Sequence, residues 1–448
     1  MRTVAIRRPG TAAAAAALCV CATACGGEGL RSLFVGYTPH ERYEHSLREA
    51  GLDQTALGRD WVAAAEEALD RAVPLEAPYR EESYLDPREA AASGYRIGLR
   101  RGQRLRAQFE SEPDSAYRVF FDVFVIPTGS AGTPRLLASA DSLERELDFV
   151  ARRDGDYLLR IQPELLRGGR YSITIVVGSS LAFPVDGHDT GAIRSWFGDP
   201  RDGGSRNHDG VDIFAPRGTP VIAAANGSVR STRRNRLGGK VVWLTDELGR
   251  SLYYAHLDSQ VVARGDPVRV GDTLGFVGNT GNARTTPPHL HFGIYERGYG
   301  PSDPYPALYD PPSTPAVFSG DPALIGELGR VSRDRTRVRS LPTSRAPVVT
   351  ELSRHTPVRV TAGTGSWYRI ALPDGASGYL AAELTELADS PIRSELVANG
   401  AILRTQPALS ALALDSLIPG AEVPVLGSYG AFLYVQAPSG RAGWLSLN

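Results

Sequence analysis

The chain has 448 residues, of which 42% are hydrophobic and 22% are charged, and its formal net charge at pH 7 is −1. This length predicts two to four domains, and the composition is that of a globular protein rather than a disordered one. The near-neutral charge excludes a nucleic-acid-binding surface that spans the whole chain, so we predict no nucleic-acid partner.

The first 25 residues, MRTVAIRRPGTAAAAAALCVCATAC, have the order of an export signal: basic residues, a short apolar stretch and then small residues. The apolar stretch is too short to be read as a stable membrane span. All three cysteines of the chain lie in this segment, so the rest of the chain cannot form a disulfide.

The end of this segment, ATAC followed by two glycines, resembles a bacterial lipoprotein signal in which Cys25 is the lipidated residue. Ala22 departs from that pattern, because leucine usually stands at this position. The resemblance implies a membrane partner reached through a lipid anchor. It also implies a location in the cell envelope, in the periplasm or at the outer membrane of a diderm bacterium. The alternative is an ordinary secretory signal that is cut near Ala24.

Residues 30–92 are predicted to be a helical segment, and residues 93–180 are predicted to be a β-sandwich accessory domain. Trp61 and Ala65 follow helical spacing, and Pro74 ends the pattern. The period then changes to two in segments such as YRVFFDVFVI and GRYSITIVV, which predicts strands. This part resembles the small sandwich domains found beside secreted bacterial peptidases, and a structural spacer is the alternative.

Two histidines stand one residue apart in PPHLHFGIY, residues 287–295. Alternate side chains of a strand share a face, so His289 and His291 are predicted to point one way while Leu290 and Phe292 point into the core. A pair of this kind is a weak signal by itself.

Two further segments carry similar side chains. In RNHDGVDIF, His208 and Asp212 are predicted to share the face of a strand, with Gly210 leaving the space between them open. In SLYYAHLD, His256 is predicted to share a face with Tyr254. The three segments together point to a site built from strands.

His208, Asp212 and His291 offer two imidazole nitrogens and one carboxylate oxygen, a donor set that suits Zn²⁺. Three protein ligands leave the fourth tetrahedral position to water, as in catalytic zinc sites. Such a site lowers the pKa of the bound water towards ~7. The pattern does not assign His256 or His289 to the metal, and each could move a proton or polarise a carbonyl group.

The segments FPVDG, HDGVDIFAPRGTPV, YYAHLD and PPHLHFGIY follow one another as in the M23 metallopeptidases, the lysostaphin-like peptidoglycan endopeptidases. The resemblance covers about residues 182–306 and predicts a zinc peptidase domain over residues 182–310 with a β-rich, groove-forming fold. It implies one Zn²⁺ per chain, held by the three ligands above, and a catalytic pair made by His256 and His289. Pro287 is a small departure, because glycine is frequent at this position in the family.

Residues 311–328 are predicted to be a linker, and the tail after it contains an internal repeat with an offset of 65 residues. The two units, residues 329–388 and 392–448, resemble bacterial SH3-like domains, which commonly attach secreted enzymes to cell walls. The alternative is a pair of structural β-modules without a ligand. Trp367 and Tyr379 are candidates for wall contact, and packing in the barrel core is the alternative role for both.

These patterns predict a mainly β, multidomain protein with an N-terminal helical segment, a β-sandwich, a β-rich metallopeptidase domain and two SH3-like barrels. The predicted function is a zinc-dependent endopeptidase that hydrolyses stem-peptide cross-links, with peptidoglycan as the partner. One alternative is a non-catalytic protein of the same fold that binds the wall or activates an amidase. The other is a peptidase for exported proteins.

Overall fold

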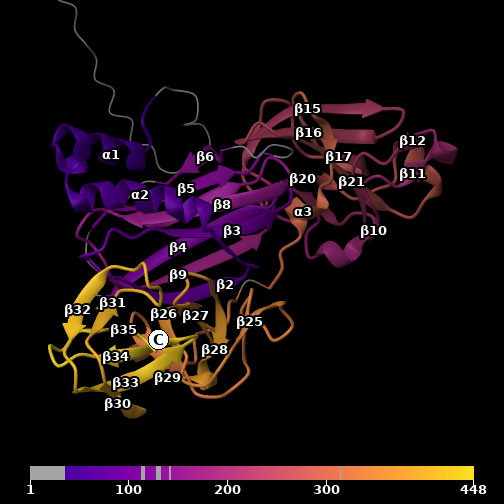
Figure 1. The fold of residues 1–448 in the computed structure, drawn as a ribbon. Helices are drawn as coiled ribbons and strands as arrows, with labels where there is room; N and C mark the ends of the chain where they lie inside the picture. The colour runs from indigo at the N-terminus through magenta and orange to yellow at the C-terminus, as the bar shows by residue number, and fades with distance from the viewer. Residues whose placement is uncertain (1–35, 113–116, 128–132, 141–142, 313, 448) are drawn as a thin grey trace, which may run out of the picture.

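The computed structural model (Figure 1) describes residues 36–112, 117–127, 133–140, 143–312 and 314–447. The predicted export signal, residues 1–25 with its lipidation site Cys25, lies outside these residues. Strands make up most of the regular structure, which confirms the predicted mainly β, multidomain fold. Within the described residues, no helix is both long enough and apolar enough to cross a membrane.

Two helices begin the described chain, α1 (Pro39–Glu49) and α2 (Ala56–Asp70). α1 starts with a capping box, in which the side chains of Thr38 and Glu41 each accept a hydrogen bond from the backbone N–H of the other. α2 packs against the sandwich through Trp61, which is 1% exposed. The helices therefore belong to the same folded unit as the sandwich.

The helical prediction is wrong after Asp70, where the chain becomes extended. Pro74 and Pro78 lack the backbone N–H that a helix interior needs. The segment that follows alternates buried with more exposed side chains, the pattern of a strand with one buried face, and it forms β2 (Tyr79–Leu85).

The sandwich consists of two sheets that pack over one apolar core. The first sheet contains, in spatial order, β1 (Val73–Pro74), β3 (Ser93–Leu99), β8 (Gly155–Pro163), β5 (Val119–Val125) and β6 (Arg135–Ser139). The second contains β2, β9 (Gly169–Gly178), β4 (Arg104–Glu112) and β7 (Glu146–Val150). Phe109, Phe121 and Ile173 are buried between the two sheets.

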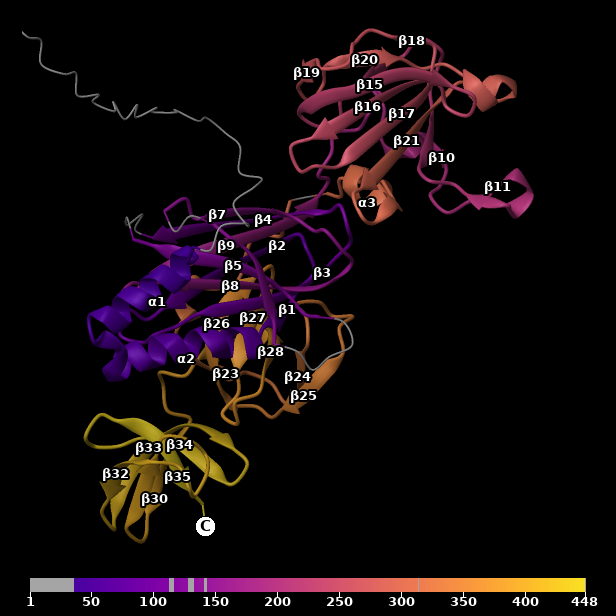
Figure 2. The same ribbon diagram turned by 90° about the horizontal axis from the view of Figure 1, so that it is seen from above.

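Residues 182–310, here called the central domain, are built on one large sheet and one small sheet. The large sheet contains, in spatial order, β10 (Ile193–Ser195), β13 (Val211–Phe214), β21 (His289–Glu296), β17 (Ser251–Leu257), β16 (Gly239–Asp246), β15 (Gly227–Asn235) and β19 (Pro267–Val268), and β22 (Gly300–Ser302) pairs with β21. The small sheet contains β14 (Pro220–Ile222), β20 (Thr273–Phe276) and β18 (Ser259–Gln260). The domain also has a hairpin that projects from it in Figure 2, β11 (Pro200–Arg201) and β12 (Arg206–Asn207), and a short helix, α3 (Tyr305–Leu308).

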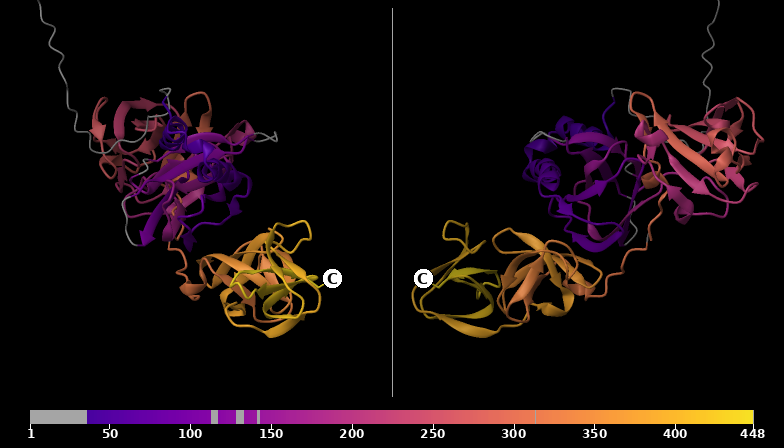
Figure 3. Two further views of the ribbon diagram at one scale, coloured as in Figure 1. Left: turned by 60° about the vertical axis from the view of Figure 1, so that its left-hand side comes forward. Right: turned by 90° about the vertical axis from the view of Figure 1, so that its right-hand side faces the viewer.

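The tail forms two small barrels, which lie side by side below the sandwich in the right-hand view of Figure 3. The first barrel contains β23 (Leu328–Val331), β24 (Thr336–Arg339), β25 (Val348–Leu352), β26 (Pro357–Thr364), β27 (Trp367–Ala371), β28 (Ser377–Ala381) and β29 (Thr385–Leu387). The second contains β30 (Arg393–Val397), β31 (Ala401–Arg404), β32 (Ala413–Leu417), β33 (Ala421–Tyr429), β34 (Phe432–Gln436) and β35 (Ala442–Ser446). Each barrel has an apolar core of its own.

The sandwich and the first barrel share one continuous sheet, because β2 pairs with β26. Glu82 lies opposite Gly363 in this pairing, and the Ser83 hydroxyl donates to the carbonyl oxygen of Thr361 over 2.7 Å. The first barrel is therefore docked on the sandwich as well as tethered by the linker.

A chain of buried polar groups crosses the same junction. The Tyr379 hydroxyl lies 3.2 Å from that of Tyr79, which donates to one oxygen of the Glu81 carboxylate, and Arg369 donates to the other oxygen over 3.1 Å. Tyr379 is 1% exposed, so the prediction that it contacts the wall is wrong. It is buried at the junction with the sandwich rather than in the apolar core of the barrel. Trp367 is half-buried.

Candidate metal centre

Two neighbouring strands place a carboxylate beside an imidazole. β13 and β21 are antiparallel, with Asp212 opposite His291 and Phe214 opposite His289. Directly opposed side chains lie on the same face of a sheet, so these four share one face. Leu290, between the two histidines, is fully buried on the other face, as the alternation in the sequence predicted.

His208 reaches this face from a loop. The strand predicted for its segment begins only at Val211, so His208 and Asp212 do not share a strand face. Gly210 explains how the loop fits: a Cβ at this position would lie 2.3 Å from the carbonyl oxygen of Phe292 and 3.0 Å from the His291 ring. The glycine thus allows a close backbone approach to β21, rather than leaving open space.

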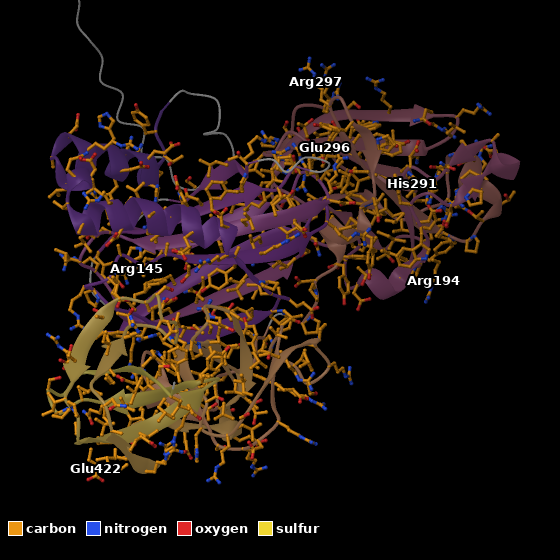
Figure 4. The ribbon with its side chains drawn as sticks, viewed as in Figure 1. Arg145, Arg194, His291, Glu296, Arg297 and Glu422 are labelled. Atoms are coloured by element: carbon orange, nitrogen blue, oxygen red, sulfur yellow. The ribbon has the colours of Figure 1, made fainter. Side chains whose placement is uncertain are left out.

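Three ligand atoms converge at this point. Nε2 of His208 lies 2.9 Å from Nδ1 of His291 and 3.0 Å from Oδ1 of Asp212, and the last two atoms are also 3.0 Å apart. His208 and Asp212 are buried, and Figure 4 shows His291 inside the central domain. The structure therefore brings together all three predicted ligands.

The position of the ring proton of His208 determines whether this cluster can bind a cation. Nδ1 of His208 lies 2.8 Å from the carbonyl oxygen of Trp196, which can only accept a hydrogen bond, so Nδ1 carries the proton. Nε2 of the neutral ring then presents a lone pair to the two other ligand atoms, an arrangement that a cation stabilises. Ligand atoms about 2.0–2.1 Å from a tetrahedral ion lie about 3.3 Å apart. The observed separations are close to this value, so the residues fit a divalent cation such as Zn²⁺.

Arg201 belongs to the centre and was not identified from the sequence. It lies on the β11–β12 hairpin, and its Nη2 donates to Oδ2 of Asp212 over 2.8 Å. This contact holds the carboxylate with Oδ1 towards the two imidazoles. Arginine is common in this chain, so its position seven residues before His208 carried no signal.

The Asp212 carboxyl stays ionised in this environment. Burial by itself raises its pKa, but the imidazoles of His208 and His291 outweigh that effect, so the pKa lies below its ordinary value. An ionised carboxylate is the form that binds a metal ion.

The backbone conformation that places His256 at the site was not predicted from the sequence. Tyr254 is fully buried in the core, and alternation along β17 would place His256 on the same face. His256 instead has φ of +63°, a left-handed conformation that costs a non-glycine residue about 1–3 kcal/mol. Its ring lies 5.0 Å from that of His289, centroid to centroid. The strained backbone thus turns the imidazole towards the metal centre.

His256 and His289 present the same ring nitrogen. Nδ1 of His256 donates to the carbonyl oxygen of Thr280 over 2.9 Å, and Nδ1 of His289 donates to that of Pro287 over 2.8 Å. In the neutral form of either ring, Nε2 therefore keeps its lone pair. Burial, together with the neighbouring His289 and His291, lowers the pKa of His256 to about 4, so this ring is neutral at pH 7 and can accept a proton.

The central domain also has a cavity of about 390 Å³, which neither His256 nor His289 lines. Phe214 forms part of its wall and stacks on the His289 ring, with centroids 5.0 Å apart. Arg194, at the outer edge of the central domain in Figure 4, lies on another part of the wall. Phe214 is thus the residue that connects this cavity with the site.

Comparison with known families agrees with this geometry. Residues 206–304 match the profile described as Peptidase family M23, and this range contains the five predicted site residues. Residues 206–304 are an M23 peptidase domain. Residues 334–386, within the first barrel, match the profile described as Bacterial SH3 domain. The resemblances noted in the sequence are confirmed for both regions.

Relatives of the M23 domain include named endopeptidases. The L-Ala--D-Glu endopeptidase of Bacillus subtilis is 38% identical over 138 residues, which are 28% of this chain and 42% of the relative. The peptidoglycan DD-endopeptidase ShyC of Vibrio cholerae is 36% identical over 99 residues, 22% of either chain. The chain thus spans less than half the length of these relatives. Among solved structures, the catalytic domain of lysostaphin from Staphylococcus simulans is 32% identical in sequence. The match covers 26% of this chain and 90% of the lysostaphin domain, with a TM-score of 0.24.

Proposed function

We propose that this chain is a zinc-dependent endopeptidase that hydrolyses stem-peptide cross-links in peptidoglycan. The observation that carries the proposal is the convergence of three ligand atoms within 3.0 Å of one another, beside two further imidazoles on the same M23 domain. The relatives include a peptidoglycan DD-endopeptidase, which supports the choice of substrate.

His208, Asp212 and His291 would hold the Zn²⁺ ion. The ion would act there as a Lewis acid and lower the pKa of a bound water towards ~7. Arg201 keeps Oδ1 of Asp212 directed at the two imidazoles, and the carbonyl of Trp196 keeps Nε2 of His208 unprotonated. Asp212 and His208 are therefore each held by a second contact outside the ligand set.

His256 and His289 transfer the proton of the attacking water. Nε2 of one neutral ring accepts the proton of the attacking water, and the imidazolium that forms can donate to the oxyanion and then protonate the leaving amine. The hydrogen bonds from Nδ1 to backbone carbonyls keep both rings in the tautomer that this step needs. The two rings are 5.0 Å apart, so both can contact one substrate carbonyl.

We also propose that the protein acts in the cell envelope and is anchored there through a lipid on Cys25. The envelope location follows from the proposed substrate, and the anchor rests on the lipoprotein-like segment of the sequence. The five site residues argue against the non-catalytic alternative, because a protein that only binds the wall has no need of them.

Digestion of purified sacculi tests the proposed function. We expect the full chain to release peptide fragments with new amino termini, to lose this activity after metal chelation and to regain it with Zn²⁺. Mass spectrometry of the fragments identifies the cleaved bond. Sacculi left intact by a zinc-loaded protein that digests casein would instead support the alternative of a peptidase for exported proteins.

A further inference from the structure

The first barrel carries an excess of positive charge that the second barrel lacks. Residues 329–388 contain nine arginines and five acidic residues, whereas residues 392–448 contain three of each. The two barrels are repeats of one fold, so the fold does not require the difference. A local excess of one charge on a chain of net charge −1 indicates a binding surface for the opposite charge.

Much of this charge surrounds one cavity of about 300 Å³ on the first barrel. We call it the arginine pocket and define it by five side chains on its wall: Arg333, Arg335, Arg337, Arg339 and Trp367. Among the described residues that line the pocket, Asp334 is the one with a negative charge. The wall therefore combines a net positive charge with one aromatic surface.

The local backbone directs these arginines outward. In β24, Thr336 and Val338 are buried in the barrel, so Arg337 and Arg339 lie on the outer face. Arg335, just before the strand, has φ of +55°, a left-handed conformation that is unfavourable for a residue with a side chain. The barrel thus keeps a strained arginine at the edge of the pocket.

The chain itself neutralises only part of this charge. Arg337 lies 3.2 Å from the Glu351 carboxylate, and Arg339 donates to the carbonyl oxygen of Ala346 over 2.6 Å. In the part of the chain that the structure describes, Arg333 and Arg335 form no ion pair. Two guanidinium groups on the pocket wall are therefore available to an anionic ligand.

The second barrel shows what the same fold looks like without the pocket. Sixty-five residues after the first three arginines of the pocket stand three uncharged residues: Ala398, Gly400 and Ile402. Arg339 has a counterpart in Arg404, so three of the four arginines of the pocket are confined to the first repeat. Figures 1 and 2 show β25, which pairs with β24, on the side of the first barrel that faces away from the second barrel.

We propose that the arginine pocket binds free carboxylate groups on the peptide part of peptidoglycan, as a second contact with the polymer outside the M23 domain. A guanidinium group binds a carboxylate through two parallel hydrogen bonds, and Trp367 offers an apolar face to the aliphatic part of the peptide. The choice of a wall peptide rests on the proposed function, because the polymer cleaved by the M23 domain is then the acidic ligand within reach. Retention on that polymer raises the local concentration of cleavable bonds.

Co-sedimentation with sacculi tests this inference. The full chain with His289→Ala, which slows digestion by about 10²-fold or more, is pelleted with untreated sacculi and with sacculi whose carboxyl groups have been amidated. We expect amidation to weaken binding at least about tenfold, the order expected for losing charge-assisted hydrogen bonds. The triple variant Arg333→Gln, Arg335→Gln, Arg337→Gln should bind untreated sacculi with the same weakened affinity and respond no further to amidation.

The control removes the same number of charges elsewhere. Arg59, Arg71 and Arg88 lie on the exposed surface of the N-terminal part, and their replacement by glutamine should leave binding unchanged. Binding that survives amidation, or a pocket variant that binds like the control, overturns the inference. Binding that disappears when phosphate polymers are stripped from the sacculi, with the carboxyl groups intact, overturns it in favour of a phosphate ligand.

Failure of this inference and failure of the proposed function give different results. In the background with His289 intact, the pocket variant should cleave a short soluble muropeptide at the same rate as the parent. If the parent cleaves no muropeptide but binds sacculi through the arginines, the proposed endopeptidase function is wrong and the proposed role of the arginine pocket is supported. If the parent cleaves muropeptides and the pocket variant binds sacculi as the parent does, the proposed role of the arginine pocket is wrong and the proposed endopeptidase function is supported.

Discussion

Asp212 and His291 lie opposite each other on β13 and β21, and Oδ1 of Asp212 is 3.0 Å from Nδ1 of His291. The two residues are 79 positions apart along the chain, so it is the register of the sheet that makes them neighbours. His289 lies on the same strand and face as His291, yet its ring contacts Phe214 and His256 instead. The first prediction follows from this difference.

His291→Ala should remove a metal ligand, and His289→Ala should not. We expect His291→Ala to lose most bound zinc and all measurable activity. His289→Ala should keep one zinc per chain and lose about 10²- to 10⁴-fold in kcat, the usual contribution of a general acid or base. Zinc content by atomic absorption, measured together with muropeptide turnover, checks both. Equal loss of zinc in the two variants would show that the roles are assigned wrongly.

Arg201→Gln should weaken metal binding without removing a ligand. The substitution takes away the hydrogen bond to Oδ2 of Asp212, and loss of such a supporting contact typically costs about 10- to 100-fold in metal affinity. Competition with a chelator measures the affinity. Arg206→Gln on the same hairpin is the matched control, because Arg206 pairs with Asp202 instead. If both variants bind zinc like the parent, Arg201 does not position the ligand.

Gly210→Ala should destabilise the M23 domain at the metal centre. The new Cβ would lie 2.3 Å from the backbone oxygen of Phe292, so the loop that carries His208 must move. Overpacking of this kind costs about 1–3 kcal/mol of unfolding free energy, and we expect zinc affinity to fall as well. Gly98→Ala is the control, since its Cβ would meet only a side-chain oxygen of Asp156 at 3.8 Å. Denaturant unfolding of both variants decides the matter.

Arg369→Met should destabilise the junction between the sandwich and the first barrel. Glu81 is fully buried, and the substitution leaves its carboxylate without the guanidinium that compensates it. Breaking a buried ion pair from one side costs about 3–5 kcal/mol. Arg96→Met removes an exposed pair with Asp156 and should cost no more than ~1 kcal/mol. Similar unfolding free energies for the two variants would contradict the importance of the buried pair.

Cys25→Ser should release the exported protein from membranes. Lipoprotein-type acylation requires the cysteine, and firm anchoring needs more than one acyl chain. Fractionation of cells that express the parent or the variant, with immunoblotting of membrane and soluble fractions, measures the effect. A variant that stays with the membranes would show that another element anchors the protein.

The sequence by itself determined the residue types of the metal centre and the modular order of the chain. His208, Asp212 and His291 could be selected because ligand chemistry depends on the kind of side chain, and strand alternation indicated that His289 and His291 share a face. The repeat in the tail likewise predicted two barrels, since each unit carries its own apolar pattern. These features are encoded over short stretches, where local spacing is sufficient.

Only the tertiary structure decided which distant groups meet. The left-handed backbone of His256 departs from the alternation of its strand, and the contact of Arg201 with Asp212 depends on where a projecting hairpin folds back. The burial of Tyr379 depends on the docking of the first barrel against β2, a segment whose strand the sequence did not predict. Each of these features is stabilised by contacts between segments far apart along the chain, so local periodicity cannot reveal it.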